Sequence, residues 1–177
     1  MNCRRRAVLK RLSTGLALAL SLMLPMATGA SASGPTRTTN PFPSPPPIIP
    51  GLCGSAAGVE IIPLRDNEYN TIFSNAAGTP QLVITTGALS VRVVNLSNNK
   101  SLDVNIPGPG ETTFQSDGTF SLTMEGPWLF IVFPGQKLSP RMFLNDGLMT
   151  ATFDAAGNIQ SLTIIGGYHQ DLCAALA

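Results

Sequence analysis

The chain has 177 residues and carries 11 Lys and Arg residues against 10 Asp and Glu residues, a net charge of +1. Five of the basic residues lie within residues 1–11, which leaves six basic and ten acidic residues and a net charge of −4 for the rest of the chain. Nucleic acids and anionic membranes bind basic surfaces, so this balance argues against both as partners of the mature protein. The length fits one domain.

Residues 1–32 have the pattern of a secretory signal peptide. A basic segment over residues 1–11 precedes an apolar stretch over residues 12–26, and Ala30-Ser31-Ala32 fits the A-x-A cleavage rule. The apolar stretch is shorter than the ~20 residues that span a membrane, so we expect no stable membrane anchor after cleavage. Arg5 and Arg6 fit the bacterial twin-arginine route as well as the general secretory route, and both stay open. We expect a protein secreted by a bacterium.

Residues 33–51 form a proline-rich segment, with seven prolines among residues 35–50. Proline fixes φ and has no backbone N–H to donate, so we expect this segment to stay out of any sheet. It is interpreted as an extended, semi-rigid spacer between the signal peptide and a folded domain.

The folded domain is expected over residues 52–177, with a cysteine near each end. Cys53 and Cys173 are the two cysteines left after signal removal, and in an exported chain they most simply pair with each other. Such a disulfide would bring the two ends of the domain within about 6 Å. Two cysteines and one histidine are a poor zinc ligand set, so no metal site is expected.

The domain is predicted to be all-β. Apolar residues alternate with polar ones at 102–106, 120–124 and 161–164, which is typical of antiparallel strands with one face in water. The last of these stretches belongs to a strand expected at 159–165, and further strands are expected at 59–62, 71–73, 81–85, 89–96, 128–133 and 148–153. Eight or nine short strands favour an antiparallel β-sandwich, with a closed up-and-down β-barrel as the alternative.

Turn and cap residues separate these strands. Turns are expected at 98–100, 117–118, 145–147 and 154–158, where Asn, Asp and Gly cluster. A short helical turn is expected at 172–176, with Asp171 as its N-cap and Cys173 within it.

Residues 128–133 (WLFIVF) are apolar on both faces of their strand. One interpretation is a central strand that is covered on both sides. The other is a partner or ligand surface formed by Trp128, Phe130 and Val132.

The sequence assigns no catalytic residue and no cofactor. His169 is the single histidine, no G-x-S-x-G motif is present, and Asp171 lies only two residues from His169. The acidic residues are scattered, and the densest polar cluster, residues 65–70, is interpreted as a solvated loop. No phosphate-binding loop or dinucleotide-binding motif is present.

From Thr86 onward the chain resembles small exported bacterial β-proteins of unknown function. The resemblance rests on Val93-Val94-Asn95-Leu96 with Lys100, on residues 107–110, Asp117-Gly118 and residues 153–158, and on Asp171-Leu172-Cys173-Ala174 at the end. It implies export, one disulfide and an all-β fold, and it brings no activity with it.

The leading hypothesis is a non-enzymatic extracellular module, structural or binding. An alternative is a carrier of a small apolar ligand, in a barrel cavity lined by residues such as Phe120, Leu122 and Phe130. A third is a secreted hydrolase that uses His169. The partners left open are an extracellular protein and a small apolar ligand.

Overall fold

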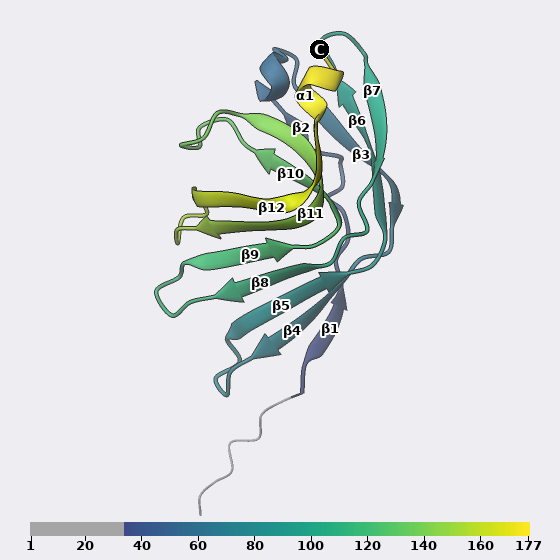
Figure 1. The fold of residues 1–177 in the computed structure, drawn as a ribbon. Helices are drawn as coiled ribbons and strands as arrows, with labels where there is room; N and C mark the ends of the chain where they lie inside the picture. The colour runs from purple at the N-terminus through teal and green to yellow at the C-terminus, as the bar shows by residue number, and fades with distance from the viewer. Residues whose placement is uncertain (1–33) are drawn as a thin grey trace, which may run out of the picture. The chain divides into compact units, whose positions relative to one another are not determined.

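The computed structural model describes residues 34–177 (Figure 1). The predicted signal peptide, residues 1–32, lies outside the described residues. In the described part of the chain, no helix has the length and apolar character needed to cross a membrane.

Strands dominate residues 34–177, as the alternating pattern predicts. The twelve strands of this part are β1 (Thr36–Thr39), β2 (Ile48–Ile49), β3 (Val59–Asp66), β4 (Tyr69–Ser74), β5 (Pro80–Thr86), β6 (Leu89–Asn95), β7 (Ser101–Asn105), β8 (Gly110–Phe114), β9 (Phe120–Met124), β10 (Pro127–Val132), β11 (Arg141–Phe153) and β12 (Ile159–Asp171). A 3-10 turn, η1 (Leu52–Gly54), precedes β3, and a helical turn, α1 (Leu172–Ala175), ends the chain.

The strands form two antiparallel sheets. The larger sheet has the order β1-β4-β5-β8-β9-β11-β10, with β12 on β11, and the smaller sheet has the order β2-β3-β6-β7. Figure 1 shows the strands of the larger sheet running across those of the smaller one. Over residues 34–177 the sheets do not close into a barrel, so the all-β sandwich is confirmed over the barrel alternative.

β11 and β12 form a long hairpin in the larger sheet. β9 and β10 follow each other along the same side of β11 in one unbroken register, from Phe120 opposite Phe153 to Val132 opposite Arg141. β12 runs along the other side of β11. Because side chains alternate between faces along a strand, this hairpin presents two opposite apolar faces where β10 meets β11.

Each of these faces belongs to a separate core. The inter-sheet core contains Ile49, Leu52, Val59, Ile61, Leu89, Val91, Val93, Val104, Ile106, Met142, Leu172 and Leu176. The second core, on the opposite face of β10 and β11, contains Met124, Phe130, Val132, Phe143, Met149, Ala151 and Ile159.

The proline-rich segment joins both sheets at its ends. β1 pairs with β4 and β2 pairs with β3, so the expectation that residues 35–50 stay out of the sheets is wrong for these two short stretches. Neither strand contains a proline, and each lies at a sheet edge, where only one side of the backbone needs partners.

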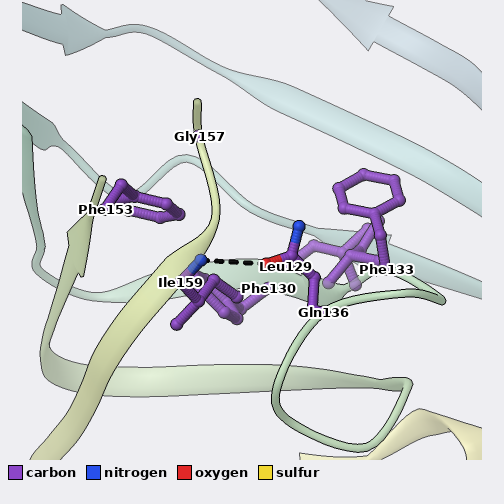
Figure 2. Close-up of a pocket in the computed structure, with 8 residues that line it drawn as sticks. Leu129, Phe130, Phe133, Gln136, Phe153, Gly157 and Ile159 are labelled. Atoms are coloured by element: carbon purple, nitrogen blue, oxygen red, sulfur yellow. Dashed lines mark hydrogen bonds between the residues drawn. The ribbon is translucent and has the colours of Figure 1, made fainter. Parts of the chain in front are cut away.

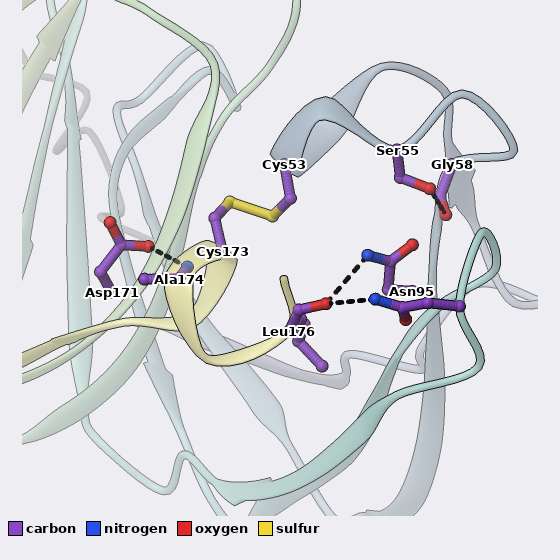
Figure 3. Close-up of a disulfide and its surroundings, with 9 residues drawn as sticks. Cys53, Ser55, Gly58, Asn95, Asp171, Cys173, Ala174 and Leu176 are labelled. Carbon is purple, nitrogen blue, oxygen red and sulfur yellow. Dashed lines mark hydrogen bonds between the residues drawn. A yellow bond between two sulfur atoms is a disulfide. The ribbon is translucent and has the colours of Figure 1, made fainter.

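The disulfide and the terminal helical turn are confirmed. Cys53 and Cys173 are bonded, with their Cα atoms 4.8 Å apart (Figure 3). A side-chain oxygen of Asp171 accepts a 3.0 Å hydrogen bond from the backbone N–H of Ala174, which is the predicted N-cap. The side-chain amides of Asn95 and Asn98 both donate to the carbonyl oxygen of Leu176, so the end of the chain is held by polar contacts as well.

One expected turn is wrong. Asn145, Asp146 and Gly147 lie within β11, where the register with β12 shifts by one residue. A Cβ atom on Gly147 would lie 2.4 Å from the carbonyl oxygen of Gly166. The glycine therefore permits a close backbone approach at a β-bulge instead of a chain reversal.

Candidate functional site

β10 (Pro127–Val132) is covered on both faces, whereas Phe133, the last residue of the predicted strand, lies after its end and is 48% exposed. Leu129 and Ile131 pack against the inter-sheet core, whereas Trp128, Phe130 and Val132 belong to the second core or pack against it. Val132 is 0% exposed and Phe130 is 6% exposed. A contact surface formed by these three residues stays a prediction. In the structure, Trp128 and Phe130 line two separate pockets.

The side chain of Trp128 rests on a connection rich in glycine and proline. Its indole nitrogen donates a 3.0 Å hydrogen bond to the carbonyl oxygen of Pro109. A Cβ atom on Gly108 would lie 2.4 Å from Cδ1 of the indole, and one on Gly110 would lie 2.5 Å from Cζ2. The absence of side chains at these two glycines therefore leaves space for the indole ring, which packs closely against their backbone.

The indole ring of Trp128 lines a pocket of about 330 Å³, called the inter-sheet pocket because residues of both sheets contribute to it. Its apolar lining comes from both sheets and from the segment after β1, and comprises Phe42, Leu89, Ile106, Leu122, Trp128 and Leu129. Its polar lining comprises Asn40, Glu68, Thr85 and Thr112. Apolar walls with a few polar groups at one side are typical of sites for small organic ligands.

A hydrogen-bonded network fixes the polar side of the inter-sheet pocket. Asn40 donates from Nδ2 to a carboxylate oxygen of Glu68 at 3.3 Å and accepts from Nδ2 of Asn70 at 3.2 Å. Thr85 donates from its hydroxyl to Oδ1 of Asn70 at 2.7 Å. Three segments that are distant in sequence thus hold each other's side chains in place, which preorganises the polar side.

The carboxyl group of Glu68 has a shifted acidity. Partial burial raises its pKa above the ordinary value of 4.5, and the neighbouring Asp66 carboxylate raises it further. The hydrogen bond from Asn40 lowers the pKa but does not reverse the shift. A half-buried carboxyl group at the edge of an apolar pocket is suited to receive a hydroxyl or amine donor from a ligand.

Phe130 lines a second pocket, of about 280 Å³, beside the loop that joins β10 to β11 (Figure 2). In this loop, Gln136 accepts a 2.9 Å hydrogen bond at Oε1 from the backbone N–H of Ile159. Lys137 donates to the side chain of Gln160 at 2.9 Å. The loop is thereby tied to the start of β12 and covers one end of the second core.

The residues expected to line the cavity of an apolar-ligand carrier do not share one pocket in the structure. Leu122 lines the inter-sheet pocket and Phe130 lines the second pocket. Phe120 stacks on Phe153 with ring centroids 4.6 Å apart. The carrier hypothesis placed these residues in a closed barrel, whereas the larger of these two pockets lies where the two sheets meet.

His169 is exposed on β12 and lines a pocket of about 170 Å³ with Arg141 and Asp171. Asp171 is engaged in capping α1. Among residues 34–177, no serine, threonine or carboxylate is hydrogen-bonded to the imidazole, so the arrangement gives the hydrolase hypothesis no support. In the same part of the chain, no group of three or more His, Cys, Asp and Glu residues is placed to hold a metal ion.

The sequence did not indicate the polar residues of the inter-sheet pocket. The cluster at residues 65–70 was interpreted as a solvated loop, yet it contributes Glu68 and Asn70 to the network. No protein-family model, no curated protein and no solved structure matches the chain.

Proposed function

We propose that the mature protein is a non-enzymatic binding module whose inter-sheet pocket holds a small, largely apolar molecule with one hydrogen-bonding end. The observation that carries this proposal is a polar network in a mostly apolar pocket: the lining residues Asn40, Glu68 and Thr85 are joined by hydrogen bonds, through Asn70 behind them, and of the remaining lining only Thr112 is polar. Apolar walls supply affinity, and the few polar groups orient the ligand and select for it.

The Glu68 carboxyl group favours a ligand that donates a hydrogen bond. A ligand that lacks a donor would desolvate the carboxyl group without compensation, which is costly for a polar group. We therefore expect the pocket to prefer an apolar alcohol or phenol over the corresponding hydrocarbon.

Fluorescence of Trp128 provides the test, since it is the single tryptophan of the chain and lines the pocket. We expect 2-naphthol to change this fluorescence saturably and to bind at least about tenfold more tightly than naphthalene. If neither probe alters the fluorescence up to its solubility limit, the proposal fails.

A matched pair of variants separates pocket binding from surface adsorption. Thr112 lines the pocket, whereas Thr113, the next residue of β8, points to the opposite face of the sheet. Thr112→Phe should fill part of the pocket and weaken 2-naphthol binding by about tenfold or more, and Thr113→Phe should leave it unchanged. Equal effects of both variants would contradict binding in this pocket.

We also propose that the chain is exported and that the mature protein begins at Ser33. The basic and apolar segments of residues 1–26 and the cleavage pattern at Ala30-Ser31-Ala32 support export. The Cys53–Cys173 disulfide fits an oxidising compartment. Mass spectrometry of the protein recovered from the medium of a bacterial culture that expresses it should give an N-terminus at Ser33. Retention of Met1 in the cell would contradict export.

A further inference from the structure

β12 is an unusual edge strand. In the described part of the chain it pairs with β11 alone, so alternate backbone N–H and C=O groups along its 13 residues face away from the sheet. Of its side chains only Ile159 is buried, and Ile165 and Tyr168 are 53% and 60% exposed. Long, exposed and apolar edges readily pair with another strand.

The other strands with a single partner in residues 34–177 are protected. They are six residues long or shorter. β1 carries Arg37, and β7 carries Asp103 in an ion pair with Arg92 at 2.7 Å. β10 begins with Pro127 and is partly or fully buried along its length. Short length, charge and proline are among the features that keep sheet edges from pairing, and β12 has none of them between Ile159 and Gln170. The β10–β11 loop holds the start of β12 through Gln136, and register irregularities flank Ser161–Ile165, so this stretch is the part of the edge that is left open.

We propose that the β12 edges of two copies of this chain pair antiparallel about a two-fold axis at Thr163. The register of β12 with β11 is regular from Ser161 to Ile165, between two irregularities, and Thr163 is the middle of this stretch. Paired residues share a sheet face, so a two-fold axis perpendicular to the sheet passes midway between one residue and the same residue of the partner.

This register is complementary with itself. Residue Leu162 of one copy lies opposite Ile164 of the other on the face that carries the second core, and Ile164 in turn lies opposite Leu162. The strand carries no Lys, Arg, Asp or Glu before Asp171, so two copies meet without like-charge repulsion. These two features favour a second copy over a charged peptide as the partner.

The size of the contact sets the expected affinity. The regular stretch of five residues, Ser161 to Ile165, is about 17 Å long and, with side chains on both faces, about 10 Å high, or roughly 170 Å² per copy. This area is far below the ~800 Å² per partner of a standard interface, so we expect a weak dimer with a dissociation constant no tighter than about 100 µM.

Sedimentation velocity of the mature protein from about 10 µM to 1 mM tests the proposal. We expect a reversible monomer–dimer equilibrium that Thr163→Lys and Thr163→Glu each abolish, because like charges then face each other at the axis. An equimolar mixture of the two variants should restore the dimer. Thr123→Lys, which lies on the same face but two strands from the edge, should dimerise like the parent protein.

A second variant covers the case in which a charged residue disturbs folding. Two Thr163→Cys side chains facing each other across the axis would lie within disulfide range, so mild oxidation should give a covalent dimer, and Thr123→Cys should not. A parent protein that stays monomeric at 1 mM overturns the proposal. So does a dimer that survives Thr163→Lys, or a Lys and Glu mixture that stays monomeric.

Discussion

The indole nitrogen of Trp128 donates a 3.0 Å hydrogen bond to the carbonyl oxygen of Pro109. This contact joins β10 to the connection between β7 and β8, and the ring that it orients is a wall of the inter-sheet pocket. Tryptophan is suited to this position because its apolar ring packs against the walls while its N–H satisfies a backbone acceptor.

The first prediction concerns the space that the ring occupies. Gly110→Ala would place Cβ 2.5 Å from Cζ2 of Trp128 and force the ring or the backbone to move. Overpacking of this kind costs about 1–3 kcal/mol, which urea unfolding measures, and the emission of Trp128 should shift as the ring moves. Gly34→Ala is the control, since nothing lies within 4 Å of a Cβ at that position. Equal stability and emission in both variants would show that the ring does not depend on the glycine.

The second prediction concerns Glu68 and pH. Its pKa is raised in the folded protein, so the unfolded chain ionises first, near 4.5, and ionisation penalises the folded state as pH rises from there. The penalty is complete above the folded pKa and absent below about 4.5, where both states are protonated. Glu68→Gln should therefore be slightly more stable than the parent protein at pH 7, and the difference should disappear in acid.

Thermal unfolding at a series of pH values checks this prediction. The expected gain is small because the carboxyl group is half exposed and solvent screens it. Glu111→Gln removes one negative charge at an exposed position and controls for net charge. If Glu68→Gln is less stable than the parent protein at pH 7, the carboxylate stabilises the fold and the inferred direction is wrong.

The third prediction concerns the disulfide. Cys53 and Cys173 are 120 residues apart in sequence, so their bond restricts the unfolded chain strongly. Replacing both by Ala should lower the free energy of unfolding by about 2–4 kcal/mol. Asn98→Ala, which removes the hydrogen bond to the carbonyl oxygen of Leu176 and the one that its Oδ1 accepts from the backbone N–H of Lys100, should cost less, about 1–2 kcal/mol. A loss below about 1 kcal/mol on removal of both cysteines would show that buried Leu172 and Leu176 suffice to hold the chain's end.

Local patterns predicted most of the strands, the disulfide and the terminal helical turn, but not the two short strands β1 and β2 in the proline-rich segment. Alternation predicts β7 because its side chains at 101, 103 and 105 are exposed and those between them are not, and Asp171 predicts α1 because an N-cap is a contact within one turn. The turn at residues 154–158 is likewise formed by contacts between residues close in sequence. There Oδ1 of Asp154 accepts from the backbone N–H groups of Ala156 and Asn158. Signals of this kind need no knowledge of the rest of the fold.

The polar side of the pocket could not be predicted in the same way. Asn40 and Glu68 are 28 residues apart, and Asn70 and Thr85 lie on neighbouring strands whose pairing the sequence does not specify. Their hydrogen bonds exist only after β1, β4 and β5 have assembled. The sequence pattern does not predict β8 for a related reason. Its first residue, Gly110, is a glycine because the ring of Trp128 packs against it, and a glycine weakens the pattern of a strand.

The last prediction concerns the β-bulge at Gly147, where the sequence pattern predicts a turn. Gly166 and Gly167 both have positive φ, 73° and 89°, so Ala at either position is strained by about 1–2 kcal/mol. Only at Gly167 does a Cβ also meet a neighbour, 2.1 Å from the carbonyl oxygen of Asp146. Gly167→Ala should therefore lower the free energy of unfolding by clearly more than Gly166→Ala, because β11 and β12 must separate to admit the methyl group. Urea unfolding gives the comparison. Equal losses in the two variants would mean that backbone strain alone, and not the close approach of the strands, makes glycine necessary at the bulge.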